Sequence, residues 1–187
     1  MHVPLAAVLG TCYAASEAIL TATRRAGPRT ARADRGSLAL LWLVIGVSVG
    51  LAIEASYRLR SFGFAPSAFW EWLGTVVFVS GVVLRWYAIG HLGRFFTVNV
   101  AIAEDHRLID TGPYRLMRHP SYTGSLIAIL GIAISMCNLV SFLVLLGPTI
   151  LVFLHRMGVE EQALLAAFGE RYRSYMRSTA RLLPGIY

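Results

Sequence analysis

The chain has 187 residues, of which 56% are hydrophobic and only 14% are charged, and its mean hydropathy is +0.61. This composition is too apolar for an ordinary soluble domain of that length, so the sequence predicts an integral membrane protein. The formal net charge is +7, and every basic residue that contributes to it is an arginine. The arginines gather between the apolar segments, as in chains oriented in a bilayer, and they form no stripe interleaved with aromatic residues. The charge therefore does not predict a nucleic-acid partner.

Three apolar segments occupy the N-terminal half, at residues 3–22, 38–53 and 69–89. Their lengths are close to the roughly 20 residues that a helix needs to cross a bilayer. Aromatic residues edge the short loop between the second and the third segment, which is typical of a membrane interface. Residues 1–90 are therefore predicted to contain three transmembrane helices.

A longer apolar stretch follows at residues 122–154. As one helix it would be roughly 50 Å long, whereas the hydrocarbon core of a bilayer is only about 30 Å thick. Arginines flank the stretch on both sides, and Asn138 lies near its middle. These features favour a helical hairpin that turns near Cys137 and Asn138 over one tilted helix. The predicted total is five crossings.

The arginine distribution orients this predicted five-helix bundle. Three predicted cytoplasmic segments hold 14 arginines, whereas the predicted outer loop holds two. Because basic residues accumulate on the cytoplasmic side, we expect the N-terminus outside and the site on the cytoplasmic face. The sequence predicts an all-α, multi-pass protein of a bacterial or archaeal inner or plasma membrane. It forms one domain over residues 1–187, with the functional part at residues 91–187.

The segment after the hairpin predicts an amphipathic helix over residues 155–177. Apolar and aromatic side chains lie close to one helical stripe, while most of the arginines lie off it. Such a helix can lie on the membrane surface and cover the cytoplasmic end of the bundle. Arg156 and Glu160 are four residues apart, so we expect both side chains on the same helix face just beyond the last crossing.

Polar groups also gather directly before the hairpin. The segment from Gly112 to Tyr122 contains arginines, a histidine and two tyrosines beside the long apolar stretch. An ionisable group without a partner is costly near hydrocarbon, so such groups are expected to face a ligand, a partner or water. We therefore predict a functional site where this segment meets the helix after the hairpin.

These polar segments resemble the isoprenylcysteine carboxyl methyltransferase family. The resemblance covers residues 94–187, and it depends on the order of several motifs rather than on any one of them. The motifs are His106-Arg107-Leu108-Ile109, Gly112-Pro113-Tyr114, Arg118-His119-Pro120-Ser121-Tyr122-Thr123-Gly124, the apolar hairpin, Glu160-Glu161 and Phe168-Gly169-Glu170-Arg171-Tyr172.

The resemblance implies a small all-helical membrane enzyme that binds S-adenosylmethionine on its cytoplasmic side, under the C-terminal helix. It implies that Arg156 meets the carboxylate of the acceptor and that Glu160 touches the cofactor, and these two are the implied catalytic residues. The implied acceptor is an isoprenylated cysteine or a similar lipid-tailed carboxylate, whose tail enters from the membrane lipids. The residues implied to bind the cofactor are Asn99, His106, Arg107, Leu108, Ile109, Tyr114, His119, Pro120, Ser121, Tyr122 and Glu160.

The implied reaction is compatible with these residue types. Methyl transfer from a sulfonium needs donor and nucleophile held about 3 to 3.5 Å apart, and a carboxylate is already ionised at pH 7. No general base is then obligatory, and Arg156 can bind the carboxylate through two parallel hydrogen bonds. An amine acceptor would need a proton acceptor, and His119 or Glu160 would have to take that role.

Three alternatives remain open from the sequence. One is a phospholipid or other amine N-methyltransferase on the same scaffold. Another is a reductase that resembles the sterol reductases and uses a nicotinamide cofactor, and the third is a membrane scaffold without enzymatic activity. The histidines and cysteines show no metal-ligand spacing, so no metal site is predicted. The sequence does not specify an oligomeric state.

Two further predictions concern the transmembrane helices. Glu17 and Arg85 are expected near the inner surface, with their charged ends reaching to water, and outside the functional site. Gly46 and Gly50 form a pair of small residues four apart, which predicts close packing of the second helix against a neighbour.

Overall fold

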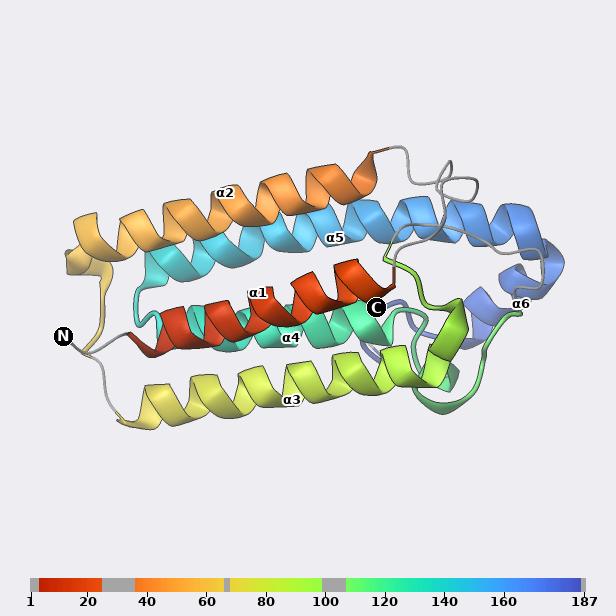
Figure 1. Cartoon of the computed structure of the whole chain (residues 1–187), viewed down its shortest axis with the longest axis horizontal. Helices are drawn as coiled ribbons and strands as arrows, with labels where there is room; N and C mark the ends of the chain where they lie inside the picture. The colour runs from red at the N-terminus through yellow and green to blue at the C-terminus, as the bar shows by residue number, and fades with distance from the viewer. Residues whose placement is uncertain (1–3, 25–35, 66–67, 99–106, 186–187) are drawn as a thin grey trace.

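The computed structural model describes residues 4–24, 36–65, 68–98 and 107–185, and most of this part of the chain is helical. Five long helices lie side by side, which confirms the predicted all-α bundle (Figure 1). The long helices are α1 (Leu5–Thr23), α2 (Ser37–Arg58), α3 (Ala68–Leu92), α4 (Pro120–Ser135) and α5 (Leu139–Phe168). The short ones are η2 (Arg60–Phe62), η3 (Gly93–Phe95), η4 (Gly112–Arg115) and α6 (Glu170–Ser178).

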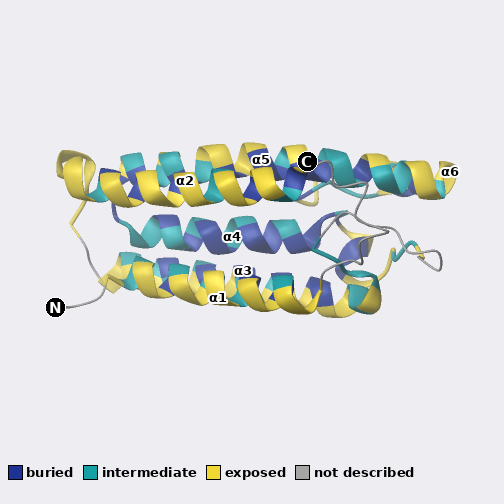
Figure 2. Ribbon diagram, turned by 45° about the horizontal axis from the view of Figure 1, so that its top comes forward, coloured by how far each residue is buried: buried dark blue, intermediate teal, exposed yellow. Residues whose placement is uncertain are grey.

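Four of the five long helices are long and apolar enough to span a membrane. By length and composition, α1, α2, α3 and α5 can each cross a membrane, whereas α4 is apolar but has only 16 residues. Sixteen residues make a helix about 24 Å long. Helix α4 lies in the middle of the bundle and is largely buried among its neighbours (Figure 2). Because protein encloses it, its ends do not have to reach the two membrane surfaces.

Helices α3 and α4 approach each other very closely through glycines on both helices. A Cβ atom added at Gly81 would lie 2.3 Å from the backbone nitrogen of Ala128, and one at Gly131 would lie 2.4 Å from a backbone nitrogen of α3. Small residues at such contacts allow dispersion forces between backbones to hold membrane helices together. The predicted glycine packing of the second helix is wrong, because a Cβ atom at Gly46 or Gly50 would meet no atom within 4 Å.

The hairpin between α4 and α5 turns at the predicted place. Cys137 has a left-handed φ of 49°. The side-chain oxygen of Asn138 accepts a hydrogen bond from the backbone nitrogen of Ser141 at 2.9 Å, and its amide nitrogen donates to the carbonyl of Leu59 at 2.9 Å. The Ser141 hydroxyl donates to the carbonyl of Ala52 at 2.8 Å. These bonds satisfy backbone groups at the start of α5 and fasten the turn to the end of α2.

Helix α5 continues well beyond the apolar stretch. It runs unbroken to Phe168, so residues 155–168 extend the fifth long helix and do not form a separate surface helix. Gly169 adopts a φ of 54°, which lets the chain turn from α5 into α6. The prediction of one amphipathic helix over residues 155–177 is therefore wrong. As a consequence, the residues after the hairpin stay beside the segment that leads into α4 (Figure 1).

Candidate active site

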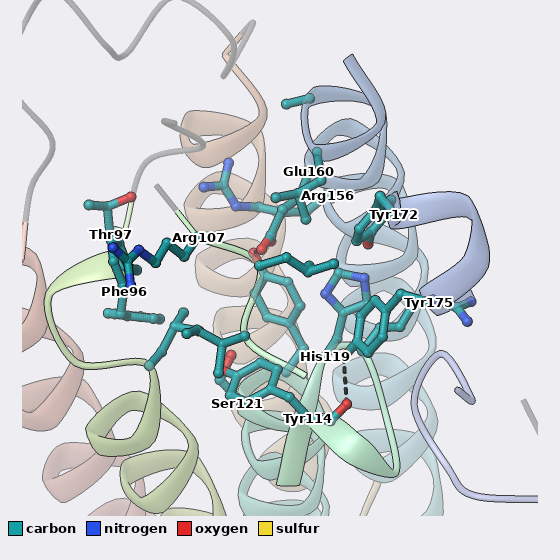
Figure 3. Close-up of a pocket in the computed structure, with 18 residues that line it drawn as sticks. Phe96, Thr97, Arg107, Tyr114, His119, Ser121, Arg156, Glu160, Tyr172 and Tyr175 are labelled. Atoms are coloured by element: carbon teal, nitrogen blue, oxygen red, sulfur yellow. Dashed lines mark hydrogen bonds between the residues drawn. The ribbon is translucent and has the colours of Figure 1, made fainter. Parts of the chain in front are cut away.

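The segments before α4 and after α5 meet at the end of the bundle where α6 lies (Figure 1). They enclose a cavity, which we call the first cavity, with walls from α4, α5, α6, η4 and the chain after α3 (Figure 3). The sequence prediction that these two segments form a common site agrees with this arrangement. The predicted site residues that line the first cavity are Arg107, Leu108, Ile109, Tyr114, His119, Ser121, Tyr122, Arg156 and Glu160.

Three predicted cofactor-binding residues are not among those that line the first cavity. Asn99 and His106 lie outside the described residues. Pro120 is buried as the first residue of α4. A proline suits this position because its fixed φ is helical and its missing N–H leaves no donor unpaired. Pro120 thus begins the helix whose first turn carries Ser121 and Tyr122 into the cavity wall.

Arg156 is anchored deep in the wall of the first cavity. Only 2% of its surface is exposed. One terminal nitrogen donates to the hydroxyl of Ser37, and the other donates to the carbonyl oxygen of Val98. The guanidinium therefore joins α5 to the start of α2 and to the chain after α3. These two partners are neutral, and a planar guanidinium in a cavity wall is a group that recognises carboxylates and other anions.

Tyr122 reaches from α4 to α5 across the floor of the first cavity. Its hydroxyl donates to Oε2 of Glu160 at 2.8 Å. Its ring packs edge-on against Phe153, with the ring centroids 5.4 Å apart, and lies 5.6 Å from the ring of His119. A hydrogen bond to a carboxylate is strong where water is scarce, so this contact fixes the direction of the Glu160 side chain.

Glu161, the neighbour of Glu160, has a different set of partners. Its Oε1 accepts from Nε of Arg118 at 3.1 Å and lies 3.0 Å from Nε2 of His119. Its Oε2 accepts from Nη2 of Arg181 at 2.9 Å. We call these four residues the Glu161 cluster. The cluster connects the start of α4, helix α5 and the C-terminal segment, so it stabilises the wall of the first cavity from behind.

The C-terminal segment after α6 is bonded along the start of α4. The backbone nitrogen of Arg118 donates to the carbonyl of Ala180 at 2.8 Å, and the hydroxyl of Thr123 donates to the carbonyl of Leu182 at 2.9 Å. These bonds come directly after α6 in the chain. They therefore fix α6 in its place over the first cavity.

Two tyrosines of α6, Tyr172 and Tyr175, line the first cavity, and neither is among the predicted site residues, although Tyr172 ends one of the motifs that carry the resemblance. Tyr175 donates its hydroxyl to the carbonyl of Tyr114 at 2.6 Å. Tyr172 is only 1% exposed, and its hydroxyl has no hydrogen-bond partner among the described residues. Burial raises the pKa of both hydroxyls above the ordinary value for tyrosine, so both stay protonated and can donate. A buried donor without a partner, placed in a cavity wall, is expected to meet a ligand.

A second cavity adjoins the first. Its polar side consists of Tyr13, Glu17 and Arg85, and its apolar side consists of Leu38, Leu41, Trp42 and Ile45 of α2 with Phe153 of α5. Tyr122 and Arg156 line both cavities. Arg156 therefore lies at the junction between the first cavity and a space bordered by apolar residues of two membrane-spanning helices.

Glu17 and Arg85 form a buried ion pair, and the prediction that they reach to water is wrong. They are only 6% and 7% exposed. Nε and Nη2 of Arg85 donate to the two carboxylate oxygens of Glu17 at 2.6 and 2.7 Å. The two charges compensate each other inside the bundle, which is why neither side chain needs contact with water.

One known protein family matches the part of the chain that forms most of this site. The model of the isoprenylcysteine carboxyl methyltransferase family matches residues 72–166. The chain belongs to this family. The matched segment includes α4 and most of α3 and α5, so it contains Arg156, Glu160 and the polar segment before α4. Membership of the isoprenylcysteine carboxyl methyltransferase family confirms the predicted resemblance.

Individual relatives support this membership. The chain is 37% identical over 115 residues to protein-S-isoprenylcysteine O-methyltransferase A of Arabidopsis thaliana, which is 60% of this chain and 58% of that protein. It is 28% identical over 160 residues to the B protein of the same plant, covering 82% and 81% of the two chains. A solved structure of the eukaryotic intramembrane Ras methyltransferase ICMT matches with a TM-score of 0.65 at 27% identity, over 78% of this chain and 52% of that one. The chain thus spans about three fifths of the Arabidopsis A protein and about half of the solved chain.

Proposed function

We propose that the chain transfers a methyl group from S-adenosylmethionine to the carboxylate of an isoprenylcysteine or a similar lipid-tailed acceptor. The observation that carries this proposal is the position of Arg156, which lines both cavities. A water-soluble cofactor and a lipid-tailed acceptor differ in polarity, and of the two adjoining cavities the second has a wall of apolar residues from the membrane-spanning helix α2. Both ligands would then meet beside one buried arginine, which is the group that a carboxylate requires.

The residues of the first cavity fit S-adenosylmethionine, which supplies a methyl group on a positively charged sulfur when bound. Tyr114, Tyr122 and Tyr175 line the cavity, and aromatic faces attract cations. Glu160 offers a carboxylate to an ammonium group. The unpartnered hydroxyl of Tyr172 offers a donor to a carboxylate or a ribose oxygen. The further proposed cofactor contacts are Arg107, Leu108, Ile109, His119 and Ser121, and Asn99 and His106 stay predictions.

Arg156 binds and orients the acceptor in this proposal. Its planar guanidinium can donate two parallel hydrogen bonds to a carboxylate, which fixes the orientation of the nucleophilic oxygen. Leu38, Leu41 and Trp42 of α2 accept the lipid tail in the second cavity. The carboxylate is ionised at pH 7, so the carbon–oxygen bond forms as the carbon–sulfur bond breaks, without a proton transfer. Glu160 is therefore a binding group and not a general base.

We also propose that the cavity end of the bundle faces the cytoplasm. Basic residues accumulate on the cytoplasmic side of membrane proteins. The opposite end of the bundle carries Arg58 and Arg60 (Figure 1). The exposed arginines at the cavity end, among the described residues, are Arg24, Arg94, Arg107, Arg115, Arg171, Arg173 and Arg177.

This orientation is tested by cysteine labelling in a background without the two native cysteines. A membrane-impermeant maleimide is expected to label an Arg173→Cys variant only after the cells are lysed, and an Arg60→Cys variant in intact cells. The opposite pattern would overturn the cytoplasmic assignment.

The methyl-transfer proposal is tested with the full chain in lipid nanodiscs and methyl-labelled S-adenosylmethionine. We expect label to enter N-acetyl-S-farnesylcysteine and to be released by mild base, because a methyl ester hydrolyses readily. We expect no label in phosphatidylethanolamine under the same conditions. Base-stable label in phosphatidylethanolamine alone would mean amine methylation and would overturn the carboxylate assignment.

An arginine-to-lysine pair of variants tests the role of Arg156. Arg156→Lys keeps the charge but loses the planar pair of donors, so acceptor turnover should fall by about tenfold or more. Binding of S-adenosylhomocysteine should be unchanged. Arg58→Lys is the matched control, since Arg58 is exposed at the other end of the bundle. Weaker binding of S-adenosylhomocysteine with unchanged acceptor turnover would assign Arg156 to the cofactor.

A further inference from the structure

The ion pair of Glu17 and Arg85 is buried between α1, α3 and α4. Its geometry is bidentate, because Nε and Nη2 of Arg85 each meet one oxygen of the Glu17 carboxylate. A guanidinium held at two nitrogens cannot rotate, since its five N–H groups lie in one plane. The pair on α1 and α3 therefore fixes where the third nitrogen, Nη1, points.

That third nitrogen points at the first two turns of α4. Nη1 of Arg85 donates to the carbonyl of Ser121 at 3.1 Å and to the hydroxyl of Ser125 at 2.6 Å. The Ser125 hydroxyl in turn donates to the same Ser121 carbonyl at 3.0 Å. Hydrogen bonds from a charged donor are stronger than neutral ones. Arg85 therefore holds the rotation of the helix turn that carries the cavity-lining residues.

The backbones of α3 and α4 are also in contact at this level. A Cβ atom added at Gly124 would lie 2.5 Å from the backbone nitrogen of Arg85 and 2.6 Å from the carbonyl oxygen of Gly81. The two backbones are too close to approach further, and any side chain larger than hydrogen at Gly124 would push the helices apart. A shift of the Arg85 guanidinium is thus transmitted to α4 through its hydrogen bonds and is not absorbed by loose packing.

The residue next to Ser121 on this turn is Tyr122, whose hydroxyl donates to Glu160 at 2.8 Å. Tyr122 also lines both cavities. Hydrogen bonds therefore link Glu17 on α1 through Arg85 on α3 to Ser121, and the next residue in the chain, Tyr122, bonds to Glu160 in the site. Helix α1 lies outside the segment matched by the family model, residues 72–166.

We propose that Glu17 and Arg85 are positioning residues for methyl transfer, which hold the first turn of α4 so that the Tyr122 hydroxyl stays on Glu160. The proposal rests on the proposed methyl transfer and assigns α1 a part in it. Both side chains also line the second cavity, and the proposal assigns them no contact with the reacting carboxylate or the methyl donor. It acts through the orientation of Tyr122 and Glu160 at the junction of the two cavities.

The test uses Glu17→Gln in the full chain in nanodiscs, with Glu54→Gln as the matched control. Glu54 also pairs with an arginine, Arg58, but the pair is exposed at the far end of α2. Loss of fixed geometry should lower kcat by about tenfold or more, because small displacements of positioned groups have large effects on such reactions. The fall in kcat should exceed any rise in the KM for N-acetyl-S-farnesylcysteine, and Glu54→Gln should leave both constants unchanged. A raised KM with unchanged kcat would mean direct contact with the acceptor and would overturn the proposal.

Combination with Tyr122→Phe separates positioning from general destabilisation. If Glu17 acts through the Tyr122 hydroxyl, Glu17→Gln should lower kcat no further once that hydroxyl is absent. Additive losses would contradict the proposal. Ser125→Ala is a second variant that leaves the ion pair intact, and it should reduce kcat in the same direction because it removes an acceptor of Nη1. An unchanged kcat in Ser125→Ala, together with an unfolded Glu17→Gln, would also contradict it.

A measurement without turnover distinguishes failure of this inference from failure of the proposed function. A fluorinated tyrosine at position 122 reports its surroundings through its fluorine resonance. The resonance should shift in Glu17→Gln and stay in place in Glu54→Gln, whether or not the chain methylates any acceptor. An identical resonance in both variants would reject the inference, whereas absence of methyl transfer by the unaltered chain would reject the proposed function.

Discussion

Removal of the Tyr172 hydroxyl should separate ligand binding from stability. Tyr172 is almost fully buried, and its hydroxyl has no hydrogen-bond partner among the described residues. Tyr172→Phe therefore removes no internal hydrogen bond, so the melting temperature should stay the same or rise slightly. If the hydroxyl donates to a bound cofactor, the loss appears only in binding. A hydrogen bond to a neutral acceptor contributes about 0.5–1.5 kcal/mol to the free energy of binding, and one to a carboxylate contributes about 1.5–3 kcal/mol. These values correspond to roughly 2- to 13-fold and 13- to 160-fold weaker binding.

The assay is isothermal calorimetry of S-adenosylhomocysteine in detergent, combined with thermal unfolding of the same samples. Tyr175→Phe is the matched control, since its hydroxyl already donates to the carbonyl of Tyr114 at 2.6 Å. That variant should lower the melting temperature, because it leaves a buried carbonyl without its donor. Unchanged S-adenosylhomocysteine affinity in Tyr172→Phe, or a fall in its melting temperature, would refute the reasoning.

Two other predictions concern the scaffold of the site. Gly81→Ala should lower the melting temperature markedly, because its Cβ atom would lie 2.3 Å from a backbone nitrogen of α4 and overpacking costs about 1–3 kcal/mol or more. Gly46→Ala is its control and should leave the melting temperature unchanged, and equal effects in differential scanning would contradict the close contact. Glu161→Gln should destabilise the chain by about 3 kcal/mol, because it leaves two arginines without their shared buried anion. An unaltered unfolding midpoint in Glu161→Gln would mean that the Glu161 cluster adds nothing to stability.

The helices of the bundle follow from local properties of the sequence. Apolar runs of suitable length predict the long helices, and the excess length of the stretch 122–154 predicts the hairpin. Its turn is found at Asn138 because this residue offers a cap at the point where both flanks require a reversal. Hydropathy and charge alone are sufficient for these elements, since each depends only on neighbouring residues.

The end of α5 was predicted less well, because two local signals compete there. Amphipathic periodicity over residues 155–177 favours one continuous helix, but Gly169 adopts a φ that ends it. The break turns α6 back toward the bundle. Tyr172 consequently faces the first cavity and not a membrane surface, which periodicity cannot reveal.

The sequence did not reveal which charged side chains of distant segments pair with each other. Glu17 and Arg85 are 68 residues apart, and each by itself resembles a charged side chain near a membrane surface. Their pairing depends on how α1 and α3 pack on α4. Likewise, Glu161 lies next to Glu160 in the chain, yet its carboxylate is directed to Arg118 and Arg181 by the helix rotation. Only the three-dimensional arrangement assigns the two acids to different partners.

The most direct test of the account is an experimental structure of the chain with S-adenosylhomocysteine and N-acetyl-S-farnesylcysteine bound together. We predict both carboxylate oxygens of the acceptor at about 3 Å from the Arg156 guanidinium, with the farnesyl tail against α2 in the second cavity. S-adenosylhomocysteine should occupy the first cavity, with the Tyr172 hydroxyl donating to it. An acceptor carboxylate bound away from Arg156, or a cofactor outside the first cavity, would contradict the account.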